Sequence, residues 1–194
     1  MTMQNGWRRV FSGMLTTIAL VASVFCGLAS AATYYIAPNG SDMNAGTSTQ
    51  PWGTWAYALR QLDPGDTLVA ENGTYDEASE AGFPNIDCAA GYANGTATQP
   101  IIVRAEQERR AFIKNNGRAA GTSFVLKNCS YWTIEGFWIE NADFNDGTQD
   151  NGSVVNISYA DHISLRRLLV QKPNRYRNSH AISLYATRNS LIEE

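Results

Sequence analysis

Residues 124–142 read FVLKNCSYWTIEGFWIENA, and a similar stretch follows at 155–173 as VNISYADHISLRRLLVQKP. A third copy begins at Ile182. In each copy apolar residues two positions apart alternate with polar ones, which is typical of strands with one buried face. The equivalent apolar positions are Phe124, Val155 and Ile182; Leu126, Ile157 and Leu184; Ile134, Leu165 and Ile192; and Ile139 and Val170.

A strand set that recurs roughly every 30 residues predicts a repeat unit that buries its inner face only against the next copy. No helical i, i+3, i+4 pattern separates the copies, which argues against alternating strands and helices. The alternative is a β-sandwich whose strands happen to align. Agreement of the columns through three copies favours an all-β parallel solenoid.

Residues 1–31 have the pattern of a secretory signal peptide. Arg8 and Arg9 precede an apolar run, and Ala29-Ser30-Ala31 provides small residues for cleavage. A membrane anchor is the alternative, but Ser, Thr and Gly residues dilute the run. We therefore expect export to the periplasm or the extracellular space, no membrane attachment after cleavage, and one β-helix domain over residues 32–194.

The composition after Ala31 argues against some partners. Without Arg8 and Arg9, 13 of the 15 basic residues remain against 18 acidic ones, so nucleic acid is not an expected partner. Two cysteines remain, Cys88 and Cys129. Export permits a disulfide between them, and buried free thiols are the alternative. No CxxC motif or Cys/His cluster predicts structural zinc.

The segment at about residues 33–66 is predicted to form an N-terminal cap on the solenoid. Thr33–Ala37 has strand alternation, and PWGTWAYALRQL at 51–62 predicts an amphipathic helix with Thr54 as its N-cap. Such a helix would cover the open end of the core. Its apolar stripe consists of Trp55, Ala58, Leu59 and Leu62.

Four motifs in this order carry a family resemblance: YYIAPNGSDMNAGT at 34–47, PWGTWAYALRQLDPGDTLVAENGTY at 51–75, PIIVRA at 100–105 and YWTIEGFWIENA at 131–142. Together they resemble secreted right-handed parallel β-helix proteins of the pectate lyase-like superfamily, in particular bacterial polysaccharide lyases. The resemblance implies a right-handed parallel β-helix. It bears less on activity, because the matching motifs are turns, cap and strands.

Lyases of that superfamily remove a proton next to a uronate carboxylate, commonly with a Lys or Arg base and a bound Ca²⁺. The basic stretch QKPNRYRNSHA at 171–181 supplies the candidate catalytic residues, and a solvated surface loop is the alternative. The candidates are Lys172, Arg175, Arg177 and His180.

The segment ADFNDGTQDNG at 142–152 supplies carboxylates that would suit Ca²⁺, a cation that prefers oxygen ligands. The candidate ligands are Asp143, Asp146 and Asp150. Their spacing does not match an EF-hand, and an ordinary polar loop is the alternative.

Substrate contacts are expected on the outward strand positions. Lys127, Ser158 and Tyr185 occupy one polar column, which would place them on adjacent coils about 5 Å apart. Trp138 alternates with buried neighbours and should point outward, either toward a sugar or into packing under a loop.

Two functions remain open from the sequence. One is a polysaccharide lyase acting on an acidic, uronate-containing polymer, and the other is a non-catalytic, adhesin-like surface solenoid that binds glycans. We expect a monomer in either case. Because Glu194 falls inside the third copy, we also expect the chain to be an N-terminal fragment of a longer protein.

Overall fold

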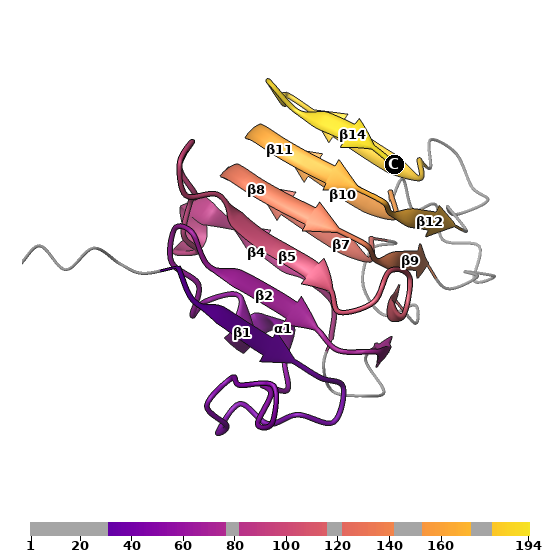
Figure 1. The fold of residues 1–194 in the computed structure, drawn as a ribbon. Coiled ribbons are helices and arrows are strands. Elements are labelled where there is room, and N and C mark those ends of the chain that lie inside the picture. Colours follow the sequence, from indigo (N-terminus) through magenta and orange to yellow (C-terminus); the bar gives the residue numbers. More distant parts are fainter. Residues whose placement is uncertain (1–30, 77–81, 116–121, 142–152, 172–179) are drawn as a thin grey trace, which may run out of the picture.

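The structure, a computed structural model, describes residues 31–76, 82–115, 122–141, 153–171 and 180–194. Its strands stack into three parallel sheets (Figure 1). Sheet 1 contains β1 (Thr33–Ile36), β2 (Thr67–Ala70), β5 (Ile101–Ala105), β8 (Ser130–Glu135), β11 (Asp161–Arg166) and β14 (Leu191–Glu193). Sheet 2 contains β4 (Asn85–Asp87), β7 (Phe124–Lys127), β10 (Val155–Ser158) and β13 (Ile182–Tyr185). Sheet 3 contains β3 (Gly73–Tyr75), β6 (Ala111–Asn115), β9 (Trp138–Asn141) and β12 (Leu169–Gln171).

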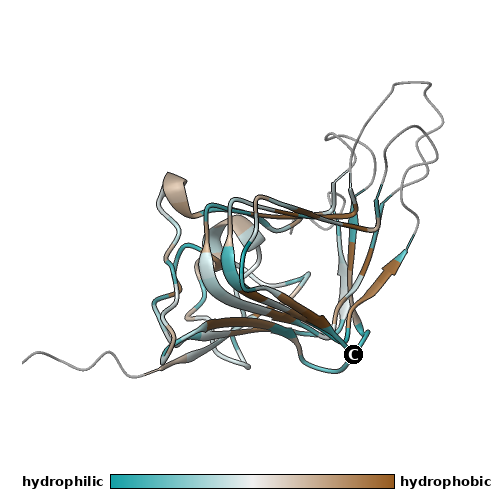
Figure 2. Ribbon diagram, turned by 90° about the horizontal axis from the view of Figure 1, so that it is seen from above, coloured by the Kyte–Doolittle hydropathy of each residue, from teal (hydrophilic) through white to brown (hydrophobic). Residues whose placement is uncertain are grey.

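Each coil passes through sheet 2, sheet 1 and sheet 3 in turn, as β7, β8 and β9 do. Corresponding strands of successive coils lie over one another when seen from above (Figure 2). The register pairs Phe124 with Val155 and Val155 with Ile182, and it also pairs Ile134 with Leu165. The columns predicted from the sequence are therefore confirmed, and the β-sandwich alternative is excluded.

The two tight corners of a coil follow one rule. After β7 comes Asn128 with a φ of 55° and then buried Cys129, and after β8 comes Gly136 with a φ of 77° and then buried Phe137. A left-handed residue turns the chain sharply, and the next side chain enters the core. The following coil repeats the left-handed conformation at Tyr159 and Arg167.

The N-terminal helix is shorter than predicted. Helix α1 covers Trp55–Ala58 rather than 51–62, because the next residues form i→i+3 hydrogen bonds, such as Gln61 N to Ala58 O, instead of continuing the helix. The predicted N-cap is confirmed, since the Thr54 hydroxyl accepts from Tyr57 N. The apolar stripe is buried as predicted, and Trp55 packs against aromatic rings of other segments.

Cys88 and Cys129 form a disulfide, which answers the question that the sequence left open. The bond ties the short 3₁₀ helix η1 (Cys88–Ala90) to the corner between β7 and β8. Within the described part of the chain, no helix has the length and apolar character needed to cross a membrane.

Candidate functional site

One outward register position on sheet 2 brings polar and aromatic side chains of four neighbouring strands into line. We call these residues the sheet 2 column: Asp87, Lys127, Ser158 and Tyr185. Three of them are the residues predicted to share a column, and Asp87 extends it by one coil. Neighbouring members are separated by the strand spacing of about 4.8 Å, so an extended polymer crossing the strands would meet one member per coil.

Asp87 is held by three donors. Asn128 Nδ2 donates to its Oδ1 at 2.7 Å, Ala89 N donates to the same oxygen at 3.0 Å, and Lys127 Nζ lies 3.7 Å from Oδ2. The Asn128 hydrogen bond is the main cause that lowers the pKa of Asp87, and the Ala89 amide and the Lys127 charge act in the same direction. The column therefore presents an ionised, oriented carboxylate whose charge offsets that of Lys127.

Two exposed tyrosines lie at the other end of the column. Tyr185 is 62% exposed and Tyr159 is 55% exposed, and their rings meet edge to face with centroids 5.4 Å apart. Tyr159 occupies a left-handed corner with a φ of 51°, directly after Ser158. Exposed aromatic faces beside polar groups are suited to a ligand that has both apolar and hydroxylated faces.

His180 does not lie with the column. It precedes β13 at the end opposite Tyr185, a distance of about 16 Å along an extended chain. Its side chain is exposed, and its carbonyl accepts from Val154 N at 3.0 Å. The structure thus gives His180 a backbone role in joining two coils and brings it near none of the column residues.

Trp138 lies on sheet 3 and so faces away from the sheet 2 column. Its ring packs against Phe112 on the neighbouring strand, with centroids 4.7 Å apart, and its indole Nε1 is buried. This is the packing arrangement that the sequence left as the alternative to sugar contact.

The remaining predicted residues lie outside the described ranges. They belong to the connections from β9 to β10 and from β12 to β13, which both lead from sheet 3 into sheet 2. Among the residues that are described, no group of three or more His, Cys, Asp or Glu is placed to hold a metal ion. The residues outside are Lys172, Arg175 and Arg177, and Asp143, Asp146 and Asp150.

Sequence reasoning missed Asp87, Asn128 and Tyr159. Asp87 ends a strand of three residues inside a segment rich in Gly, Ala and Asn, a composition typical of loops, so the sequence does not show its register with Lys127. A usable signal did exist for Tyr159, because it occupies the repeat position of Asn128, an amino acid that favours left-handed corners.

These features define a class of protein, a three-sheet parallel β-helix with an outward polar and aromatic column. Residues 34–181 match the family model described as "Pel9A-like, right handed beta helix region", and the chain belongs to this family. The match confirms the right-handed parallel β-helix that the sequence motifs implied.

Comparison with known proteins places the chain among longer molecules. It is 38% identical over 85 residues to the uncharacterized protein YwoF of Bacillus subtilis (strain 168), covering 44% of this chain and 16% of that protein. The GH136 lacto-N-biosidase from Eubacterium ramulus superimposes with a TM-score of 0.56 and 18% identity, over 84% of this chain and 34% of that one. A rhamnogalacturonan lyase gives a TM-score of 0.56 and 16% identity, over 83% and 50%. The two structural similarities concern the fold, and the chain spans half or less of each relative.

Proposed function

We propose that this protein is carbohydrate-active and binds an acidic, uronate-containing polysaccharide across the outer face of sheet 2. The sheet 2 column carries the glycan-binding part of the proposal, because it combines hydrogen-bonding groups, a hydroxyl and exposed aromatic faces at the spacing of successive coils. Since Asp87 and Lys127 neutralise one another, the choice of an acidic glycan rests on the basic stretch at 171–181 and not on the column. The basic stretch at 171–181 directly precedes β13 in the sequence, and its positive charges would attract a polyanion toward this part of the molecule.

As an enzyme, the protein would act as a lyase. A base removes the proton on the carbon next to the uronate carboxylate, the bond to the 4-linked oxygen breaks, and a double bond conjugated to the carboxylate forms. The leaving oxygen takes up a proton. The catalytic candidates remain those of the sequence, namely Lys172, Arg175, Arg177 and His180. A Ca²⁺ requirement through Asp143, Asp146 and Asp150 also remains a proposal from the sequence. The rhamnogalacturonan lyase among the structural relatives is consistent with this chemistry.

Glycan binding without cleavage is the second candidate. One observation favours it: the side chains that the structure aligns in the column are an ion pair, a hydroxyl and an aromatic ring, which can hold a glycan by hydrogen bonds and ring contacts without any reaction. Both the lyase and the glycan-binding protein would be secreted after removal of the signal segment 1–31. Mass spectrometry of the secreted protein should then find Ala32 or Thr33 at the mature N-terminus.

The experiment that tests the proposal uses polygalacturonate with the full chain and two readouts. Affinity electrophoresis measures binding, and the rise in ultraviolet absorbance from the conjugated product measures cleavage. Tyr185→Ala should weaken binding, whereas Tyr57→Ala, a change at a partly exposed tyrosine on α1, should not. Binding without product would support the glycan-binding version, and absence of binding would refute both.

A further inference from the structure

A concave surface lies on the outer face of sheet 1, on a different sheet from the proposed polysaccharide site. A groove of about 510 Å³ extends over β5, β8 and β11. This volume falls within the range of roughly 300–1,000 Å³ that is typical of small-molecule sites. The residues Ile102, Thr133 and Ser164 occupy one register position along its floor and place two hydroxyl side chains on adjacent coils.

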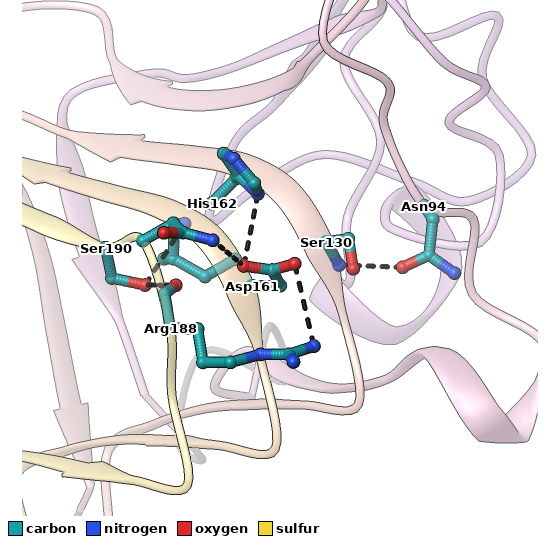
Figure 3. A network of polar contacts seen from close by, with 8 residues as sticks. Asn94, Ser130, Asp161, His162, Arg188 and Ser190 are labelled. Carbon is teal, nitrogen blue, oxygen red and sulfur yellow. Dashed lines mark hydrogen bonds and ion pairs between the residues drawn. The ribbon is translucent and has the colours of Figure 1, made fainter.

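The wall of the groove is fixed before any ligand arrives. Ala97 and Pro100 contribute this wall from the segment between η1 and β5, which the disulfide anchors at its start. Ser130 N donates to Asn94 Oδ1 at 2.7 Å (Figure 3), and Gly95 N donates to the Ser130 carbonyl at 3.0 Å. A Cβ on Gly95 would lie 2.3 Å from a backbone oxygen of β8, so this close approach requires glycine.

A stacked pair of rings borders the groove. The rings of Tyr131 and His162 lie 4.5 Å apart and within 15° of parallel, and both residues have a positive φ. The ring of His162 is oriented by Asp161, whose Oδ1 lies 3.1 Å from Nδ1 (Figure 3). Asn189 donates to the same oxygen at 3.0 Å, and Arg188 lies 3.9 Å from Oδ2. The Asn189 hydrogen bond, with the charges of His162 and Arg188, lowers the pKa of Asp161, which is therefore ionised at neutral pH.

The charges of the groove neutralise one another. Glu135 forms an ion pair with Arg167, and Arg166 Nε lies 2.8 Å from Glu193 Oε1. Because each charged lining residue already has a partner of opposite sign, the groove offers a polyanion no net attraction. The features that remain for a ligand are an aromatic pair, hydroxyls and a preformed wall.

We propose that this groove is a second saccharide site, which takes a neutral oligosaccharide of about two or three sugar rings, roughly one ring per coil. The rings of Tyr131 and His162 offer an apolar surface for the C–H face of one sugar, and Thr133 and Ser164 hydrogen-bond to hydroxyl groups of its neighbours. This site is separate from the proposed polyanion site and does not depend on it.

The test is a titration of the isotope-labelled full chain by NMR with four trisaccharides. Three are neutral (cellotriose, maltotriose and β-1,4-galactotriose) and the fourth is trigalacturonate. At least one neutral trisaccharide should shift the backbone amides of Thr133 and Ser164 saturably. Tyr131→Asn should weaken this binding about tenfold, because an aromatic face is lost.

Tyr159→Asn is the matched control, since Tyr159 also has a positive φ but lies outside the groove. It should leave neutral binding unchanged and weaken the binding of polygalacturonate. Ser164→Trp, which fills the groove, gives a second variant in case Tyr131→Asn disturbs the fold.

The proposal is overturned if none of the neutral trisaccharides shifts the groove amides, or if trigalacturonate occupies the groove as tightly as they do. Unchanged neutral binding in both Tyr131→Asn and Ser164→Trp would also overturn it. If polygalacturonate does not bind while a neutral trisaccharide fills the groove, the proposed function fails and this inference stands.

Discussion

Asn128 donates a hydrogen bond to Asp87 at 2.7 Å, across the same 41 residues of sequence that the neighbouring disulfide between Cys88 and Cys129 spans. One polar and one covalent link therefore join the same two segments at consecutive residues. The polar link orients the carboxylate of the sheet 2 column, and the covalent link anchors the segment that continues into the wall of the sheet 1 groove.

The Asp87 link should make stability depend on pH. The folded pKa of Asp87 is below its usual 3.8, so its contribution is present above that value and is lost as the pH falls through the folded pKa. Asn128→Gly keeps the left-handed corner but removes the donor. We expect this variant to be less stable than wild type in urea unfolding at pH 7, with a smaller difference in acid below 3.8. Tyr159→Gly, a corner change that removes no partner of Asp87, should show no such pH dependence.

Shortening a side chain in an interior column should lower the free energy of unfolding by an amount that depends on how deeply that side chain is buried. Ile157 is fully buried, so Ile157→Ala should lower the free energy of unfolding by about 2–5 kcal/mol through the cavity it leaves. Leu184 occupies the same column on the next coil but is 44% exposed, so Leu184→Ala should cost clearly less. Chemical denaturation of both variants of the 194-residue chain measures the difference, and equal losses would contradict the difference in burial between the two positions.

Removal of the disulfide should be costly. For a closed loop of this length, the chain-entropy estimate of the stabilisation is about 4 kcal/mol. The Cys88→Ala/Cys129→Ala double variant should therefore unfold at a clearly lower urea concentration than the oxidised protein. Reduction of the wild type should reproduce the shift, and the double variant itself should not respond to the reductant.

The basic stretch should act through charge. If it attracts a polyanion, Arg175→Gln/Arg177→Gln should weaken polygalacturonate binding most at low salt, because ions screen exposed charges at distances beyond about 10 Å at 0.1 M. Affinity electrophoresis at two ionic strengths measures the effect. Arg60→Gln/Arg110→Gln removes two exposed charges elsewhere as a control, and an equal loss there would show that net charge alone is responsible.

The sequence alone predicts which strands stack on one another where the same alternation of buried and exposed residues recurs from coil to coil. The columns through Phe124 and Leu126 were predictable because alternation with a period of two fixes which face is buried, and because three copies repeat it. Strand β4 was not recognised, since it has three residues and pairs with β7 across a long insertion. Its position in sheet 2 follows from tertiary pairing, which local propensity does not encode.

The groove on sheet 1 was missed for a different reason. Tyr131 and His162 adopt a left-handed backbone conformation that is usually signalled by Gly or Asn, so neither residue indicated a turn. The extent of α1 was overestimated because the apolar stripe continues through Leu59 and Leu62, which are buried without being helical. In that segment a helical spacing of buried residues therefore extends beyond the helical backbone.

Some intervals between strands are the same in successive coils, whereas the length of the connection into sheet 2 differs. The intervals between the starts of β7, β8 and β9 recur without change between the starts of β10, β11 and β12. The connection into sheet 2 does change, because the chain from the start of β9 to that of β10 is longer than the chain from β12 to β13. Since loop-closure entropy depends only logarithmically on length, this difference costs about 0.2 kcal/mol. The connections into sheet 2 can therefore differ in length from coil to coil, and with it in the side chains they carry, while the stacked interior keeps its register.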